Sequence, residues 1–218
     1  MLFRRLLLTL LALASIAPVP AAPEKWAAAI DKFVAADRTQ PPARDGVVFV
    51  GSSSIVKWTS LKQDFPGLNV LNRGFGGSEL ADSAFYAERL VVPLHPSVVV
   101  VYAGDNDLSL GKTPEAVHAS FKEFCTKVHT ALPATRIVFI AIKPSPSRWK
   151  MKDKVVTANA LIAATCQSDP RLAYADIYTP MLDAAGSPRP ELFVKDMLHL
   201  NEAGYALWKP IVAAQLKR

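Results

Sequence analysis

Short apolar runs alternate with stretches of helical periodicity along most of the chain. Five runs are mostly or wholly apolar, as in strands that are buried on both faces: 47–50, 68–71, 98–102, 136–142 and 172–175. Six longer stretches carry apolar residues at helical spacing: 23–38, 54–65, 80–94, 114–132, 152–166 and 202–216. The pattern therefore predicts five consecutive strand–helix units after an N-terminal helix.

Repeated strand–helix units with such strands are typical of a parallel sheet with helices on both faces. Short right-handed crossovers then favour an α/β fold, a three-layer α/β/α sandwich. We predict a flavodoxin-like strand order of 2-1-3-4-5. The chain has 218 residues, half of them hydrophobic, which suits one domain with a full core.

The first 22 residues have the features of a secretory signal peptide. Arg4 and Arg5 precede an apolar stretch at 6–17, and small residues at 18–22 suit cleavage after Ala21 or Ala22. The folded domain is then expected over 23–218, in a protein exported to the periplasm or secreted. Two basic residues leave with the signal, so the formal charge falls from +6 to +4 (6 − 2).

This modest charge and the lack of a dense Lys/Arg cluster argue against a nucleic-acid partner. At most, we expect weak contact with anionic membrane or cell-wall surfaces. Cys125 and Cys166 are the two cysteines of the chain. In an oxidising compartment they either form a disulfide or remain two separate buried thiols.

Three loops with glycine or polar residues follow the first three predicted strands. Gly51-Ser52-Ser53-Ser54 follows the first, 72–78 the second and 103–107 the third. In a 2-1-3 arrangement these loops converge at the carboxyl ends of the strands, where open α/β sheets bind ligands. The serines either cap the following helix or include a nucleophile.

One asparagine and one histidine are further candidate catalytic residues. Asn106 either donates to a developing oxyanion or belongs to an Asx-turn. His199 lies in a polar loop, and Asp196 three residues earlier can reach its Nδ1 atom. His95, His118 and His129 fall elsewhere on the predicted fold. A serine, a histidine, an aspartate and an amide donor are the groups that acyl transfer needs.

These pieces resemble the four sequence blocks of the SGNH hydrolases, also called GDSL-type esterases. Gly51-Ser52-Ser53 resembles the first block and 72–77 the second. The third is matched by 104–107, and the fourth by Asp196 with His199. The G-x-S-x-G elbow of α/β-hydrolases is absent, since Ile55 stands where its second glycine belongs. Ser52 replaces the aspartate of the first block.

The resemblance implies a serine esterase that acts on small-molecule or polymer-borne esters without a cofactor or metal. It implies a catalytic triad of Ser53, Asp196 and His199. The oxyanion hole would consist of the N–H groups of Ser53 and Gly77 and the amide of Asn106. The basic loop 143–150, with Arg148 and Trp149, either contacts substrate or is solvated.

Two other functions fit parts of the sequence. A flavodoxin-like protein would bind a phosphate or flavin at the serine-rich loop. A non-catalytic module with the SGNH fold would bind a cell-surface glycan.

Overall fold

The computed structural model describes residues 24–216, so the predicted signal peptide at 1–22 lies outside the described residues. Five parallel strands form one sheet in the order β2-β1-β3-β4-β5, which confirms the predicted fold and order. The strands are β1 (Val47–Gly51), β2 (Val70–Gly74), β3 (Val98–Tyr102), β4 (Arg136–Ile140) and β5 (Leu172–Ala175). Every residue of β1 and β3 is buried, as their continuous apolar runs predict.

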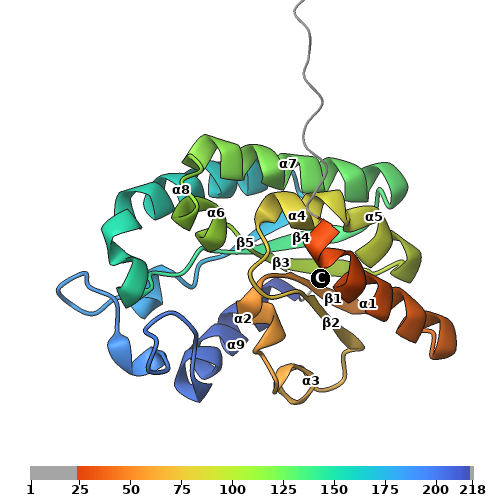
Figure 1. Ribbon diagram of the computed structural model, residues 1–218, viewed down its shortest axis with the longest axis horizontal. Coiled ribbons are helices and arrows are strands. Elements are labelled where there is room, and N and C mark those ends of the chain that lie inside the picture. The colour runs from red at the N-terminus through yellow and green to blue at the C-terminus, as the bar shows by residue number, and fades with distance from the viewer. Residues whose placement is uncertain (1–23, 217–218) are drawn as a thin grey trace, which may run out of the picture.

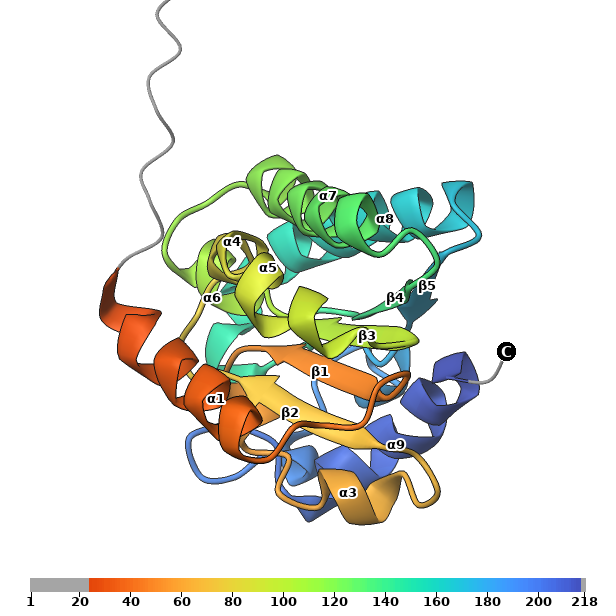
Figure 2. The ribbon, with the colours of Figure 1, turned by 90° about the vertical axis from the view of Figure 1, so that its right-hand side faces the viewer.

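Helices cover both faces of this sheet (Figure 1, Figure 2). One face carries α4 (Leu80–Phe85), α5 (Ala87–Leu90), α7 (Pro114–Ala131) and α8 (Lys152–Ser168). The other face carries α2 (Ser53–Val56), α3 (Leu61–Asp64) and α9 (Glu202–Leu216). Helix α1 (Ala27–Thr39) contacts α5, and α6 (Asp105–Ser109) follows β3. Short 3-10 helices complete the described part: η1 (Glu24–Trp26), η2 (Val92–Leu94), η3 (Pro146–Met151), η4 (Thr179–Met181) and η5 (Pro190–Leu192).

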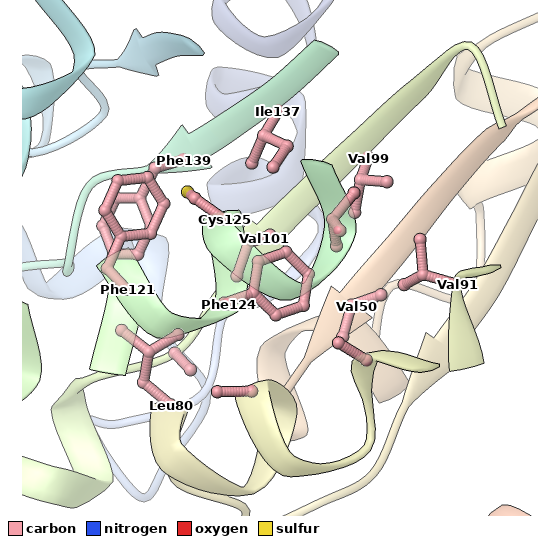
Figure 3. Close-up of a cluster of buried hydrophobic side chains, with 14 of the residues drawn as sticks. Val50, Leu80, Val91, Val99, Val101, Phe121, Phe124, Cys125, Ile137 and Phe139 are labelled. Carbon is pink, nitrogen blue, oxygen red and sulfur yellow. The ribbon is translucent and has the colours of Figure 1, made fainter. Parts of the chain in front are cut away.

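Each face of the sheet has its own apolar cluster. Beneath α7, Phe121 packs edge-on against Phe139 of β4, with 5.1 Å between ring centroids (Figure 3). On the opposite face, Trp58 and Trp208 are almost fully buried against β1 and β3. Among the described residues, no helix is both long and apolar enough to cross a membrane.

Two predicted helices are divided in the structure. The stretch 54–65 forms α2 and α3, because Asp64 accepts hydrogen bonds from the Trp58 indole at 2.7 Å and the Ser60 hydroxyl at 2.6 Å. Such local side-chain bonds compete with a continuous helix. The stretch 80–94 forms α4, α5 and η2, and Pro93 lies in the last of these.

Pairing with neighbours also moves two strand boundaries. The second strand covers 70–74 rather than 68–71, because it pairs residue by residue with the full length of β1. The fourth strand ends at Ile140 rather than at residue 142. The backbone N–H and C=O of Ile142 instead bond to the side chain of Asn159 in α8, at 2.8 and 3.0 Å.

The two cysteines are free thiols in this structure rather than a disulfide. Cys125 lies in α7 and Cys166 in α8, and both are buried in the cluster between these helices and the sheet. Burial raises the pKa of both thiols, that of Cys166 to about 12, so they act as small apolar side chains.

Candidate active site

Gly51 makes the sharp turn from β1 into α2 possible. Its φ is +140°, and a Cβ atom there would lie only 1.9 Å from the carbonyl oxygen of Tyr102. Only glycine fits so close to the neighbouring strand β3. The turn places Ser53 at the first position of α2, beside the carboxyl ends of β1 and β3.

The structure brings together Ser53, His199 and Asp196, three residues from opposite ends of the chain. The Oγ atom of Ser53 lies 3.0 Å from Nε2 of His199, and Nδ1 of His199 lies 2.6 Å from Oδ2 of Asp196. The hydrogen bond from the imidazole holds the pKa of Asp196 well below its usual range. In this arrangement the carboxylate orients the ring, and the ring can take the serine proton.

Backbone hydrogen bonds hold the histidine loop in shape. Asp196 Oδ1 accepts from the N–H groups of Leu198 and His199, both at 2.9 Å. The N–H of Val194 bonds to the carbonyl of His199, also at 2.9 Å. The D-x-x-H spacing thus folds into a compact turn that carries both side chains.

The serines do not cap the helix that follows them. Ser52 occupies the cap position of α2 but makes no capping hydrogen bond with its side chain. Ser53 faces His199, and Ser54 accepts a hydrogen bond from Lys143 at 3.3 Å. Of the two roles left open for these residues, the geometry favours a nucleophile at Ser53.

The loop after β2 lies over the same serine. A Cβ atom on Gly76 would sit 3.9 Å from Cβ of Ser53, and Gly77 has a φ of +82°. Within residues 24–216, neither the N–H of Ser53 nor that of Gly77 has a hydrogen-bond acceptor. Both N–H groups can therefore serve an oxyanion.

Asn106 joins this loop to α6. Its Nδ2 atom donates to the carbonyl of Ser78 at 2.9 Å, which leaves one amide hydrogen for a ligand. The flanking acids have other partners: Asp105 pairs with Lys143 at 2.9 Å, and Asp107 accepts the N–H of Leu80. Asn106 therefore lies in an ordered short helix rather than in the alternative Asx-turn. No group of three His, Cys, Asp or Glu side chains in residues 24–216 is placed to hold a metal ion.

Asn72 of the second block has a supporting position. Its Nδ2 atom donates to the carbonyl of Ile55 in α2 at 2.6 Å, and its Oδ1 accepts from the N–H of Gly74 at 2.9 Å. This side chain ties the helix that carries Ser53 to the edge strand β2.

The basic loop 143–150 reaches the same end of the sheet. Arg148 donates to Oδ1 of Asn106 at 3.0 Å, so its side chain faces the site. Trp149 is half-buried, with the ammonium of Lys152 5.7 Å from its ring centroid. The other three histidines lie away from Ser53: His95 before β3, and His118 and His129 on α7, bonded to Thr165 and Thr135.

Sequence reasoning missed two features near the site. Trp26 packs on Phe75 with 5.5 Å between ring centroids, and its ring comes within 3.5 Å of a Cβ position on Gly77. The helical pattern of the N-terminus gave no sign of this contact. The second feature is a buried ammonium, Lys143, within a loop whose basic composition is typical of solvated segments.

Asp107 predicts a distinct pH dependence of stability. Burial raises the pKa of Asp107 to about 6, although the hydrogen bond from the Leu80 N–H acts to lower it. The native state therefore takes up a proton more readily than the unfolded state. The contribution of Asp107 to stability is therefore lost as pH rises through about 6.

Relative to Asp107→Asn, the wild-type protein should gain up to about 3 kcal/mol of unfolding free energy between about pH 8 and pH 4. Urea denaturation of both proteins at the two pH values measures this difference. A constant difference would show that Asp107 does not titrate in this range.

Comparisons with known proteins identify a family and a shared fold. The model of the GDSL-like lipase/acylhydrolase family matches residues 46–207. No curated protein matches the sequence. A GDSL-like lipase from Bacteroides thetaiotaomicron is 18% identical, with a TM-score of 0.75 over 86% of this chain and 96% of that one. A carbohydrate esterase of family 3 from Talaromyces cellulolyticus is 16% identical, with a TM-score of 0.61 over 78% and 95%.

At these identities the structural likeness establishes a shared fold. The family match supports the general activity of an ester hydrolase. The match extends from just before β1 into α9 and so includes all four blocks. The chain belongs to the GDSL-like lipase/acylhydrolase family.

Proposed function

We propose that this protein hydrolyses carboxylic esters through an acyl-enzyme on Ser53. The observation that carries the proposal is the continuous hydrogen-bonded line from Ser53 through His199 to Asp196. Neither a phosphate- or flavin-binding role nor a passive glycan module requires this line.

In the first half-reaction, His199 Nε2 takes the proton of Ser53 as Oγ bonds to the ester carbonyl carbon. The carbonyl π electrons move onto oxygen, which accepts hydrogen bonds from the N–H groups of Ser53 and Gly77 and from the Asn106 amide. As the tetrahedral intermediate collapses, the bond to the alcohol oxygen breaks, and His199 returns its proton to that oxygen.

In the second half-reaction, a water molecule gives its proton to His199 and attacks the acyl carbon. The bond to Ser53 Oγ breaks, and the serine regains the proton from His199. Every proton and electron pair in both steps is supplied by the ester, water and these side chains, so the proposed cycle uses no cofactor.

The proposed substrates are esters of small molecules or of polymers. Both can reach Ser53, because its side chain is partly exposed and Gly77 is exposed beside it at the carboxyl ends of the strands.

We further propose that the protein is exported to the periplasm or secreted, on the strength of the signal-like residues 1–22. Its partners there would be esters, with at most weak contact to anionic surfaces and none to nucleic acid. Cell fractionation together with N-terminal sequencing of the mature protein tests this location.

The function is tested with p-nitrophenyl esters of rising acyl length and with a fluorophosphonate that traps the nucleophile. We expect turnover of at least one ester, and a covalent adduct that peptide mass spectrometry places on Ser53 rather than Ser52 or Ser54. Heat-denatured protein is the control for reagent hydrolysis. A folded protein with neither turnover nor adduct would contradict the proposal, and binding to acetylated glycans would then be measured.

Asn106→Ala should slow hydrolysis by about 10²–10³-fold, because one of three oxyanion donors is lost while nucleophile and base remain. The loss should appear in kcat, since the donor acts on charge that develops in the transition state. Steady-state kinetics on the best p-nitrophenyl ester measures it. An unchanged kcat would remove Asn106 from the oxyanion hole.

A further inference from the structure

We propose that Arg148 is a positioning residue, which fixes the Asn106 amide as an oxyanion donor and is itself held by the buried Asp105–Lys143 ion pair. The inference rests on the proposed function, because an oxyanion donor has a role only if acyl transfer occurs here. It begins with the two hydrogen bonds that Asn106 makes.

These two bonds permit only one orientation of the amide. Arg148 Nη2 lies 3.0 Å from Oδ1 of Asn106, and the carbonyl oxygen of Ser78 lies 2.9 Å from Nδ2. A guanidinium has only donors and a carbonyl only accepts, so a flipped amide would lose both bonds. Arg148 therefore keeps the amide nitrogen on the side of the Gly77 loop.

Arg148 is anchored by a carboxylate from the residue next to Asn106. Its Nη1 lies 3.2 Å from Oδ2 of Asp105, as an ion pair without the geometry of a hydrogen bond. The same oxygen accepts a hydrogen bond from Lys143 Nζ at 2.9 Å. Asp105 is 5% exposed and Lys143 2%. A buried carboxylate between two cations stays ionised, and it gives the guanidinium a fixed partner.

Lys143 connects this anchor to the nucleophile turn. Besides Asp105, its ammonium donates to the hydroxyl of Tyr102 at 2.9 Å and to that of Ser54 at 3.3 Å. Ser54 directly follows the proposed nucleophile, and Tyr102 ends β3. Burial alone would lower the pKa of Lys143, but the charge of Asp105 and the hydrogen bonds to Tyr102 and Asp105 together raise it. The buried pair thus joins the ends of β1 and β3 beneath both halves of the site.

Arg148 could instead bind an anionic substrate, and its contacts distinguish the two roles. Its side chain is only 19% exposed, and its two terminal nitrogens already face Asn106 and Asp105. A substrate-binding arginine would change mainly KM, and only for charged esters. A positioning arginine changes kcat for an uncharged ester, because it acts through the transition-state donor Asn106.

The test is a double-mutant cycle on the uncharged p-nitrophenyl ester that the wild-type protein turns over fastest. Arg148→Ala should lower kcat about 10- to 100-fold with KM nearly unchanged, as expected for losing a charge-assisted hydrogen bond. The double variant with Asn106→Ala should be no more than about twofold slower than Asn106→Ala alone. Lys150→Ala, an exposed basic residue of the same 3-10 helix, is the matched control and should leave kcat unchanged.

Added guanidinium ion should restore part of the kcat of Arg148→Ala and none of that of the double variant. If circular dichroism shows that Arg148→Ala does not fold, Arg148→Lys replaces it in the cycle. Lysine keeps the charge but not the forked donors, so this variant should show an intermediate kcat. Losses that multiply in the double variant, or a change confined to KM, would overturn the positioning role. Wild-type protein without any ester turnover would refute the proposed function, and the inference with it.

Discussion

Ser53→Ala is expected to abolish ester hydrolysis, with a fall in kcat of about 10⁴–10⁶-fold. The reason is that its Oγ is the only hydroxyl that the structure places against His199 Nε2 within the described residues, at 3.0 Å. The side chain is partly exposed and makes no other hydrogen bond in residues 24–216, so its removal should leave the thermal unfolding temperature nearly unchanged. Kinetics and a thermal melt on the same preparation measure both quantities.

His199→Ala should give a similar loss, and combining it with Ser53→Ala should cost little more, because the two residues act as one unit. Ser52→Ala is the matched control. Its hydroxyl is buried without a hydrogen-bond partner in the described part of the chain, so activity and fold should persist. That result would also show that the hydroxyl of Ser52 takes no part in the chemistry. Full activity in a folded Ser53→Ala protein would move the nucleophile elsewhere.

Gly51→Ala is expected to give the largest loss of stability, about 4 kcal/mol or more, through backbone strain and steric conflict. A methyl group at this position meets the Tyr102 backbone of β3, with the carbonyl oxygen 1.9 Å away and the carbonyl carbon 2.7 Å away. Neither neighbour is the end of a flexible side chain, so the central strands must separate. Urea denaturation, or the yield of soluble protein if none folds, measures the effect.

Gly67→Ala is the matched control for this variant. Gly67 also has a positive φ, +81°, but nothing lies within 4 Å of its Cβ position. It should lose only about 1–2 kcal/mol, the cost of a left-handed backbone conformation without a steric clash. Equal losses in the two variants would show that the positive φ, and not the contact with β3, makes Gly51 necessary.

The fold followed from the sequence because its main signals are local. Continuous apolar runs such as 98–102 are typical of strands buried on both faces, and helical stretches between them favour parallel crossovers. Helix interruptions were harder to predict. The division of 54–65 depends on hydrogen bonds between the side chains of Trp58, Ser60 and Asp64, which periodicity does not encode.

The proposed site also depends partly on local sequence signals and partly on tertiary contacts. The sequence by itself determined which residue types could carry acyl transfer, since Ser53, Gly77 and Asn106 follow predicted strands and Asp196 and His199 share one polar loop. Tertiary structure alone decided how they are supported. Lys143 reads as a solvated basic residue in a proline-rich loop, yet the crossover after β4 buries it against Asp105 and turns Arg148 toward Asn106. Contacts between residues about forty positions apart leave no periodic trace in the sequence, because their partners are chosen by sheet order and not by neighbours along the chain.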